Sequence, residues 1–289
     1  MRGACIDIGS NTTRLLVADR DSGGLREVHQ ERAFTRISRG LVKGGAISEA
    51  KIAEVAAVVS EQLHRAQELG AEHIDAVATA AIRRAGNREQ LVNAVRGSCG
   101  LEVRILTDIE EARLAFVGAA RTLAAAPDGL LGVADVGGGS SELVVGHAPD
   151  RVTWCASLAV GSGDLADEFL RSDPPSMDQL GRARASVAHT LDGIEAPRPT
   201  SAIAVGGSAT SLRLVAGDVL DDSSCERALG VLASAPAAEL GRRFGLDSDR
   251  VRLLPAGLLI LRGCGERFGV PLRIGWGGIR EGVLLEASL

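Results

Sequence analysis

The chain has 289 residues, enough for two domains of ordinary size, and 45% of them are hydrophobic, enough for two buried cores. Its formal net charge is −5, so the overall balance does not favour binding to nucleic acid or to an acidic membrane. Five scattered cysteines without a CxxC pair indicate neither a disulfide framework nor a zinc site. The first strand is expected almost at Met1, which leaves no room for a signal peptide, and no apolar run approaches the about 20 residues of a membrane span. We therefore expect a cytoplasmic protein.

Strands and helices are predicted to alternate along the first half. Apolar residues at helical spacing predict a helix that begins after Ser48, its N-cap, and ends near Leu69. The other elements are predicted from the same kinds of pattern. They are a strand–turn–strand unit at 4–19, a turn at 21–24, strands at 26–36, 74–79 and 103–106, and helices at 88–96 and 109–124.

The second half repeats this alternation. The segment Ala125 to Gly129 is the best linker in the chain, and it gives predicted domains of 1–126 and 127–289. Beyond it we expect strands at 130–136, 141–146, 152–160 and 272–276, and helices at 163–171, 177–192, 236–244 and 253–268, with a helical turn at the end. The segment 201–210 is predicted to be a strand that leads into a glycine turn and a further helix. The alternation predicts an α/β fold with mixed sheets.

A glycine turn stands between two of these strands. It carries Gly137, Gly138 and Gly139, then Ser140, and it is flanked by Asp135 and Glu142. Glycines let the backbone come close to a ligand, and successive amides in such a turn bind anions, phosphate above all. Carboxylates beside a phosphate are typical Mg²⁺ ligands. The pattern predicts a metal–phosphate site, although a plain hairpin turn is the alternative.

The same pattern occurs near the N-terminus. The segment 7–17 aligns without a gap with 135–145, so that Asp7 matches Asp135 and Gly9 matches Gly137. A match of this length indicates a duplicated unit in which each copy presents a turn to a shared ligand. Arg14 stands where the second copy has Glu142. A guanidinium group can hold phosphate oxygens, whereas a carboxylate can hold a metal or a water molecule.

Two acidic residues open the helix expected at 109–124. From the residues alone, Asp108 as N-cap and Glu111 as the third helical residue fit a capping box. The functional alternative makes Glu110 or Glu111 a general base. Two arginine groups, Arg83, Arg84 and Arg88 and also Arg32, Arg36 and Arg39, are either solvated surface or a track for a polyphosphorylated substrate.

One further motif is weak. Residues 161–166 fit a loose GxGxxA pattern between a strand and a helix. A dinucleotide-binding fold also needs an acidic residue at a strand end about 20 residues later. That part of the chain is predicted to be helical, so we do not expect a nicotinamide site. A third glycine turn, Gly206 to Thr210, lies between a strand and a helix and supports the phosphate interpretation.

These motifs together resemble the exopolyphosphatase/guanosine pentaphosphate phosphatase (Ppx/GppA) family of the actin/sugar kinase/Hsp70 superfamily. The resemblance rests on DIGSNTTRLLV, ATAAIRRAGN, EEARLAFVG, DVGGGSSELVVG, AVGGSATSL and GIREG. It implies the short two-domain form, with two ribonuclease-H-like domains and a site in the cleft between them. It also suggests a homodimer.

The resemblance implies roles for single residues. Glu111 would be the catalytic base, Asp135 and Glu142 would organise metal and water, and Asp7 would be a further metal ligand. The phosphate-binding residues would be Gly9, Ser10, Asn11, Arg14, Arg83, Gly137, Gly138, Gly139, Ser140, Gly206, Gly207 and Ser208. The chain departs from the family pattern at Thr107-Asp108-Ile109, where Ser-Gly is common, and at Asp164, where arginine is common.

The expected activity is the hydrolysis of a terminal phosphoanhydride with Mg²⁺ or Mn²⁺, the substrate being inorganic polyphosphate or guanosine pentaphosphate. One alternative is an ATP-dependent kinase or ATPase of the same superfamily. Another is a non-catalytic sensor of guanosine tetraphosphate or pentaphosphate. The sequence does not choose between the two phosphatase substrates.

Overall fold

The computed structural model describes residues 1–21, 24–42 and 45–286. Contacts divide the chain into two compact units: unit 1 is Met1–Gly118 with the C-terminal segment from Ile279, and unit 2 is Ala119–Gly278. The sequence-based division falls at 126/127 and keeps the C-terminal segment with the second half. Contacts group helix α12 (Ile279–Glu286) with unit 1 because its Val283 and Leu284 side chains pack in the core of that unit.

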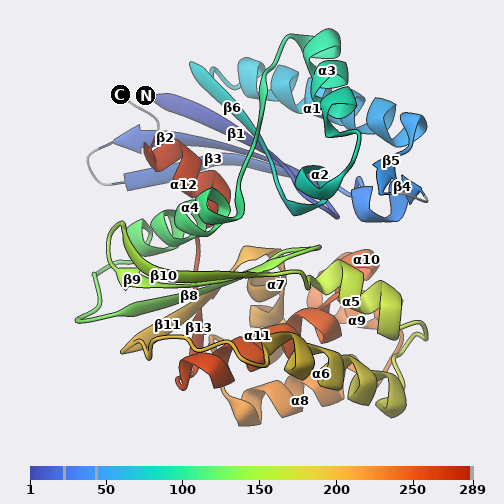
Figure 1. Ribbon diagram of the computed structural model, residues 1–289, viewed down its shortest axis with the longest axis vertical. Coiled ribbons are helices and arrows are strands. Elements are labelled where there is room, and N and C mark those ends of the chain that lie inside the picture. Colours follow the sequence, from blue (N-terminus) through green and yellow to red (C-terminus); the bar gives the residue numbers. More distant parts are fainter. Residues whose placement is uncertain (22–23, 43–44, 287–289) are drawn as a thin grey trace. The chain divides into compact units, whose positions relative to one another are not determined.

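Unit 1 contains a five-stranded mixed sheet in the order β3-β2-β1-β6-β7 (Figure 1). The strands are β1 (Arg2–Ile8), β2 (Thr13–Asp21), β3 (Gly24–Ala33), β6 (His73–Ala78) and β7 (Val103–Ile105). The β1–β2 and β2–β3 pairs are antiparallel, and the β1–β6 and β6–β7 pairs are parallel. The turn predicted at 21–24 lies partly outside the described residues.

The helices of unit 1 cover both faces of its sheet. They are α1 (Glu49–Glu68), α2 (Ala80–Arg84), α3 (Arg88–Cys99), α4 (Asp108–Arg121) and α12. The last three residues of α4, 119–121, fall in unit 2. A short 3₁₀ helix (Ile37–Gly40) and the strands β4 (Leu41–Val42) and β5 (Ala46–Ile47) complete unit 1. Ser48 caps α1 as predicted, because its side chain accepts a hydrogen bond from the Lys51 amide.

Strand β1 shows how the two faces differ. Ala4, Ile6 and Ile8 pack with α1 and α3 in one core cluster. Cys5 points to the other face and packs with α4 and α12. Because side chains alternate along a strand, Asp7 lies on the α12 face as well. This places a carboxylate at the end of β1 next to the first glycine turn.

Unit 2 repeats the topology of unit 1. Its sheet has the order β10-β9-β8-β11-β13-β12, and the first five strands match unit 1 in order and direction. The strands are β8 (Leu131–Val136), β9 (Ser141–His147), β10 (Arg151–Leu158), β11 (Ser201–Val205), β12 (Val219–Leu220) and β13 (Leu272–Ile274). In both units the turn is closed by one 3.0 Å backbone bond, Gly9 N–H to Thr12 O and Gly137 N–H to Ser140 O. The predicted duplication is therefore confirmed.

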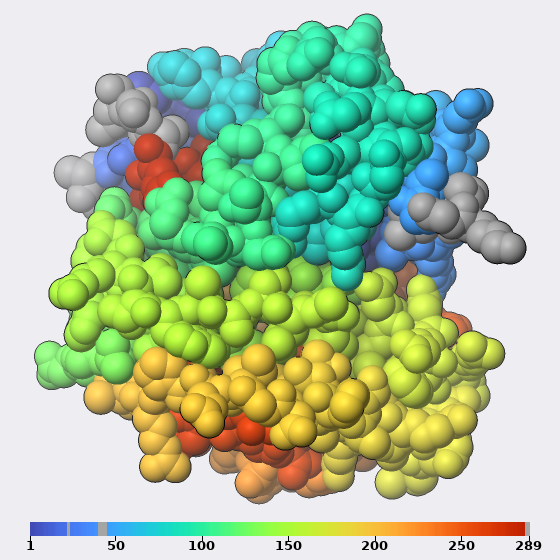
Figure 2. Space-filling view, viewed as in Figure 1, coloured from blue at the N-terminus to red at the C-terminus, as the bar shows by residue number. Residues whose placement is uncertain are grey.

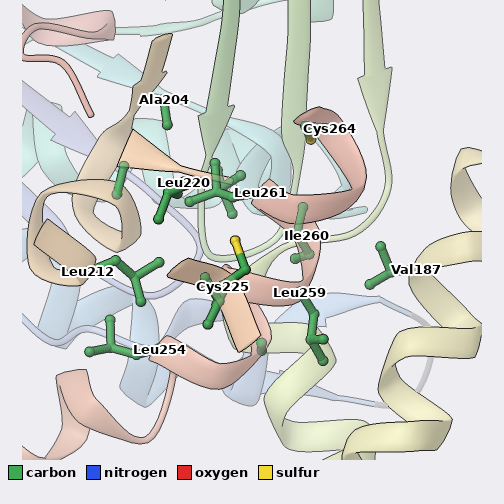
Figure 3. Packing of buried hydrophobic residues seen from close by; sticks show 14 of the residues in the cluster. Val187, Ala204, Leu212, Leu220, Cys225, Leu254, Leu259, Ile260, Leu261 and Cys264 are labelled. Atoms are coloured by element: carbon green, nitrogen blue, oxygen red, sulfur yellow. The ribbon is translucent and has the colours of Figure 1, made fainter. Parts of the chain in front are cut away.

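The core of unit 2 forms around one buried helix. Its helices are α5 (Ser162–Phe169), α6 (Met177–Leu191), α7 (Gly206–Ala216), α8 (Asp222–Leu232), α9 (Ala237–Phe244), α10 (Ser248–Val251) and α11 (Leu254–Phe268). Figure 3 shows Leu259, Ile260 and Leu261 of α11 among side chains from α6, α7, α8 and β12. On the face shown in Figure 2, red residues of this unit reach the surface between yellow and orange segments. The helix α8 and the strand β12 are not among the predicted elements.

The remaining composition-based expectations concern cysteines and membranes. All five cysteines are free; Cys5, Cys225 and Cys264 are buried, and Cys99 and Cys155 are half-buried. None of the helices in the described ranges combines the length and hydrophobicity that a membrane span requires.

Candidate active site

The glycine turn of unit 2 is held in place by the start of helix α5. The Gly137 carbonyl accepts hydrogen bonds from the amide of Ser162, at 2.9 Å, and from its hydroxyl. The Gly138 carbonyl accepts from the amides of Gly163 and Asp164, at 2.9 and 3.1 Å. A Cβ atom at Gly161 would overlap the backbone of Gly138. The glycines of the loose GxGxxA motif therefore serve backbone packing, and the first amides of α5 are occupied.

This packing sets the direction of the turn. In a trans peptide the N–H points opposite to the C=O. Because the Gly137 and Gly138 carbonyls face α5, the amides of Gly138 and Gly139 point away from it. Successive amides on one side of a turn form a site for an anion. The geometry agrees with the predicted phosphate-binding role of this turn.

A row of acidic and hydroxyl groups lies beside the turn. Asp135 on β8 is opposite Glu142 on β9, and Glu142 is opposite Ser157 on β10. The two carboxylates are 7% and 2% exposed. The Ser157 hydroxyl donates a hydrogen bond of 3.1 Å to Glu142 Oε1. Neighbouring residues Ala134 and Leu143 belong to the core cluster, so the row lies on the opposite face of the sheet.

The third glycine turn meets this row. Helix α7 begins at Gly206, whose φ is +89°, and a Cβ atom there would overlap Asp135 Oδ1. Only glycine fits a position with both the left-handed backbone and this close carboxylate. The Ser208 hydroxyl is buried and lies 3.2 Å from the Ser162 hydroxyl. Within unit 2 the structure thus brings together all the predicted site residues, and Ser208 links α7 to α5.

One residue of this region is absent from the sequence-based site. Arg250 of α10 is 5% exposed, and its Nη2 atom would lie 3.1 Å from a Cβ atom at Gly207. A buried guanidinium beside the start of a helix adds positive charge where an anion would bind. The only sequence signal is a charged residue in front of the apolar run of α11, and such a signal does not show which turn the arginine contacts.

The glycine turn of unit 1 is supported differently. The Asn11 carbonyl accepts from the Arg36 amide at 2.9 Å, and the Ser10 carbonyl accepts from the Ser38 amide at 3.1 Å. The hydroxyls of Thr13 and Thr35 share a buried hydrogen bond of 3.1 Å. The segment after β3 therefore holds the first turn in place, as the start of α5 holds the second turn.

The row beside the first turn has a different charge. Asp7 lies opposite Arg14, and Arg14 lies opposite Arg32. Asp7 Oδ1 is inaccessible and has no hydrogen-bond partner among the described residues. Burial raises the pKa of Asp7 above its usual value, and the charges of Arg14 and Arg280 act against this shift. An unsatisfied buried carboxylate oxygen is a feature that a bound cation or water would satisfy.

The start of helix α4 corrects the predicted capping box. Thr107, not Asp108, is the cap: Glu110 N–H donates to its hydroxyl, and Glu110 Oε2 accepts from the Thr107 amide and hydroxyl at 2.9 and 2.8 Å. These hydrogen bonds hold the pKa of Glu110 below its usual range. The box Asp108/Glu111 is therefore wrong by one residue. Glu110 completes the capping box with Thr107, and Glu111 takes no part in it.

Glu111 is instead buried against an arginine. It is 3% exposed, and its Oε2 accepts a hydrogen bond of 2.7 Å from Arg83 Nη1. The same nitrogen donates to the Leu106 carbonyl at 2.8 Å, and Arg83 Nη2 contacts Asp108. Arg83 stands in α2, directly after β6. Within unit 1 the Arg83 guanidinium group binds the carboxylates of Glu111 and Asp108. Arg83 therefore orients the Glu111 side chain.

The carboxylates of unit 2 meet the needs of a divalent cation that keeps most of its water ligands. Among residues 1–21, 24–42 and 45–286, no group of three or more His, Cys, Asp and Glu side chains could enclose a metal. Mg²⁺, however, usually binds through one or two carboxylates and keeps waters and substrate phosphates as its other ligands. The buried pair Asp135 and Glu142 beside a phosphate turn fits this type of site.

Comparisons with known proteins agree with this geometry. The model of the Ppx/GppA phosphatase family matches residues 16–289. The chain belongs to the Ppx/GppA phosphatase family. An uncharacterized protein of Streptomyces coelicolor is 31% identical over 311 residues (99% of this chain and 90% of that protein), and exopolyphosphatase 1 of Mycobacterium leprae is 27% identical over 277 residues (90% and 81%).

A solved structure gives the same result for the fold. The crystal structure of the Aquifex aeolicus Ppx/GppA family member superposes with a TM-score of 0.81 at 30% identity, covering 99% of this chain and 96% of that one. The predicted fold, two α/β domains of the actin/sugar kinase/Hsp70 type, is confirmed. The predicted enzyme class, a phosphoanhydride hydrolase, is confirmed by the family.

Proposed function

We propose that this Ppx/GppA family member removes the terminal phosphate of inorganic polyphosphate or the 5′-γ-phosphate of guanosine pentaphosphate. The observation that carries the proposal is the acidic row of Asp135 and Glu142, which is buried beside two glycine turns in unit 2. Several curated relatives, among them that of Mycobacterium leprae, are named exopolyphosphatases. Polyphosphate is therefore the first substrate to test.

In this proposal the glycine turns bind phosphate oxygens through their amides. The Gly138 and Gly139 amides serve in unit 2, and the turn from Gly9 to Asn11 serves in unit 1. Phosphoryl transfer depends mainly on positioning and on neutralising charge, so many fixed donors around the phosphates suffice for much of the rate. Arg250 beside Gly207 adds a fixed positive charge to the same region of unit 2.

Asp135 and Glu142 would hold a divalent cation, Mg²⁺ or Mn²⁺, with water molecules between. When bound, the cation supplies positive charge to the transferred phosphate and its leaving oxygen. Ser157 fixes one oxygen of Glu142 by its hydrogen bond. The close approach of Gly206 fixes the Asp135 side chain on its other side.

Glu111 would accept the proton of the attacking water or orient that water. It is the carboxylate at the start of α4 that the helix does not use as a cap, and Arg83 holds one of its oxygens. Arg83 fixes the orientation of the carboxylate, which is what a general base requires.

The test is phosphate release from long-chain polyphosphate and from guanosine pentaphosphate with Mg²⁺ or Mn²⁺, before and after chelation. We expect release that chelation abolishes and that a Glu111→Gln variant loses by two to four orders of magnitude, about the contribution of a general base. The variant should still bind polyphosphate. Full release by Glu111→Gln would remove the base assignment. Formation of ADP from ATP in place of polyphosphate shortening would favour a kinase or ATPase, and binding without release would favour a sensor.

A further inference from the structure

Helix α1 carries a polar residue at a core position. The buried residues of this helix recur at helical spacing from Ile52 to Ala66, and Gln62 is one of them, with none of its surface exposed. Its neighbours Val59 and Leu63 belong to the core cluster of unit 1. The spacing favours an apolar residue at this position, since glutamine is rarely fully buried. The amide of Gln62 is therefore a candidate for a specific contact.

Gln62 uses only one of the two polar groups of its amide. Its Nε2 atom donates a hydrogen bond of 3.3 Å to the Thr13 carbonyl. A carbonyl can accept only from the NH₂ group, so this contact fixes which way the amide is turned. Its Oε1 atom is inaccessible and has no hydrogen-bond partner in the part of the chain that the structure describes. A half-satisfied buried amide costs free energy, so an apolar residue of the same size would stabilise the core more.

Two buried threonines continue this contact to the first glycine turn. Thr13 directly follows the turn, and its hydroxyl shares a hydrogen bond of 3.1 Å with the Thr35 hydroxyl. Both threonines are almost fully buried. Thr35 precedes Arg36, whose amide donates to the Asn11 carbonyl of the turn at 2.9 Å. The side chains of Gln62, Thr13 and Thr35, which we call the brace, thus join α1, β2 and the segment after β3 next to the turn.

The brace acts on the side of the turn that its carbonyls face. The Ser10 and Asn11 carbonyls accept hydrogen bonds from the segment after β3. In a trans peptide the N–H points opposite to the C=O, so the amides of Asn11 and Thr12 point away from that segment. A shift of Thr13 or of the segment would turn these peptides. Successive amides bind a phosphate only while they point to one place.

We propose that Gln62, Thr13 and Thr35 are positioning residues for phosphate binding by the first glycine turn. They hold the turn from within the core and lower the stability of that core, as is common where residues serve a site. The inference rests on the proposed function, which gives the turn its ligand. It requires that an apolar residue can replace Gln62 without loss of stability but with loss of phosphate affinity.

The first test replaces the amide of Gln62 with an apolar group of similar length, in Gln62→Met. Amide hydrogen exchange is compared at Gly9 and Gly137, which make the same 3.0 Å turn bond in the two copies. The dissociation constant of long-chain polyphosphate is measured in the Glu111→Gln background. We expect an unfolding temperature equal to that of the parent or higher, exchange at Gly9 about tenfold faster relative to Gly137, and a dissociation constant about five- to tenfold larger. Gln67→Met, on the exposed face of α1, is the matched control and should change each value less than about twofold.

The threonine pair gives a second test. Thr13→Val combined with Thr35→Val replaces both partners of one hydrogen bond by side chains of the same shape, a change that is nearly neutral for stability. We expect this double variant to lose polyphosphate affinity and protection of the Gly9 amide as Gln62→Met does. Thr35→Ser keeps the hydroxyl and should stay within about twofold of the parent in both measurements.

The outcomes separate the brace from the proposed function. Polyphosphate affinity that is unchanged in Gln62→Met and in the double variant would overturn the positioning role. So would a lower unfolding temperature in both, because the residues would then serve stability alone. Faster exchange at Gly9 in these variants of a parent chain that itself binds no polyphosphate would support the positioning of the turn and refute the proposed function.

Discussion

The two halves of the molecule share one backbone pattern but differ in charge. In unit 1 the row beside the glycine turn is Asp7, Arg14 and Arg32, with a formal charge of +1; in unit 2 the matching row is Asp135, Glu142 and Ser157, with −2. The strands, their directions and the turn hydrogen bond are the same. The duplicated scaffold therefore fixes where three side chains stand, and the residues at two of the three positions give the two rows opposite charge.

The supports of the two turns differ as well. Helix α5 packs against the backbone of the second turn through Gly161, whereas a segment with a strained arginine holds the first turn. The support of the second turn consists of backbone amides and the Ser162 hydroxyl at the start of α5. The support of the first turn brings Arg36 to a row that already carries two arginines.

The largest expected effect is a loss of kcat when the acidic row of Asp135 and Glu142 is changed. Asp135→Asn removes one of two buried carboxylates without changing shape, and we expect kcat for polyphosphate to fall by two to three orders of magnitude, as for loss of one main electrostatic group. The metal concentration needed for half-maximal rate should rise. Ser157→Ala is the matched control in the same row, since it loses a single hydrogen bond to Glu142 and should cost less than tenfold. Equal losses in the two variants would contradict a metal-binding role for Asp135.

The next effect concerns the support of the second turn. Gly161→Ala places a methyl group against the backbone of Gly138, and we expect a loss of about 1–3 kcal/mol in the free energy of unfolding together with a marked loss of turnover. Gly181→Ala in α6 is the control, because its Cβ would meet nothing within 4 Å and a helix gains about 1 kcal/mol from this change. Denaturant unfolding measures both. A Gly161→Ala chain with unchanged stability and rate would mean that α5 does not fix the turn.

A smaller effect is expected at Asp108. Asp108 is exposed and contacts Arg83 Nη2, whereas Glu111 accepts from Arg83 Nη1. Asp108→Ser frees Nη2 for a phosphate oxygen, and KM for polyphosphate should fall up to about fivefold, the range of an exposed ion pair. Glu102→Gln, which breaks a surface pair with Arg96, serves as control. An increase of KM in Asp108→Ser would show that Asp108 helps to position Arg83.

The smallest effect is on stability near neutral pH. The folded-state pKa of Asp7 is raised, mainly by burial, so the native state binds the proton more tightly than the unfolded chain. Its contribution to stability therefore declines as pH rises from the usual range of aspartate through the raised value. Asp7→Asn cannot ionise and should unfold at a higher temperature than the parent at pH 7, with the difference gone below about pH 4. A lower unfolding temperature at pH 7, measured in chelator, would show that Arg14 and Arg280 outweigh burial.

Much of this arrangement follows from local sequence. The turn hydrogen bonds from Gly9 to Thr12 and from Gly137 to Ser140 lie within four residues, so a gapless repeat predicts them. The box predicted for α4, Asp108 with Glu111, has the same spacing as the one that forms, Thr107 with Glu110. Glu111 is buried against Arg83, 28 residues away, and spacing alone does not show this contact.

Contacts between residues far apart in the chain could not be predicted from the sequence. Arg250 meets Gly207 across 43 positions of the chain, a contact that only the packing of α10 against α7 creates. Helix α8 has a polar first turn and was missed, although Asp221 and Ser224 form a capping box that the sequence carries. The position of Arg32 opposite Arg14 also depends on the strand register, because a shift of one residue would turn Arg32 to the other face.

We propose that the row of unit 2 acts in the chemical step and the row of unit 1 in substrate binding. The most direct test is a parallel measurement of kcat and KM for Glu142→Gln and Arg14→Gln, since Glu142 and Arg14 occupy the same position in the two copies. The account predicts that Glu142→Gln lowers kcat about 100-fold or more with polyphosphate affinity kept within about threefold, and that Arg14→Gln raises KM about tenfold with a much smaller loss of kcat. The same response in both variants, or the reverse split, would contradict it.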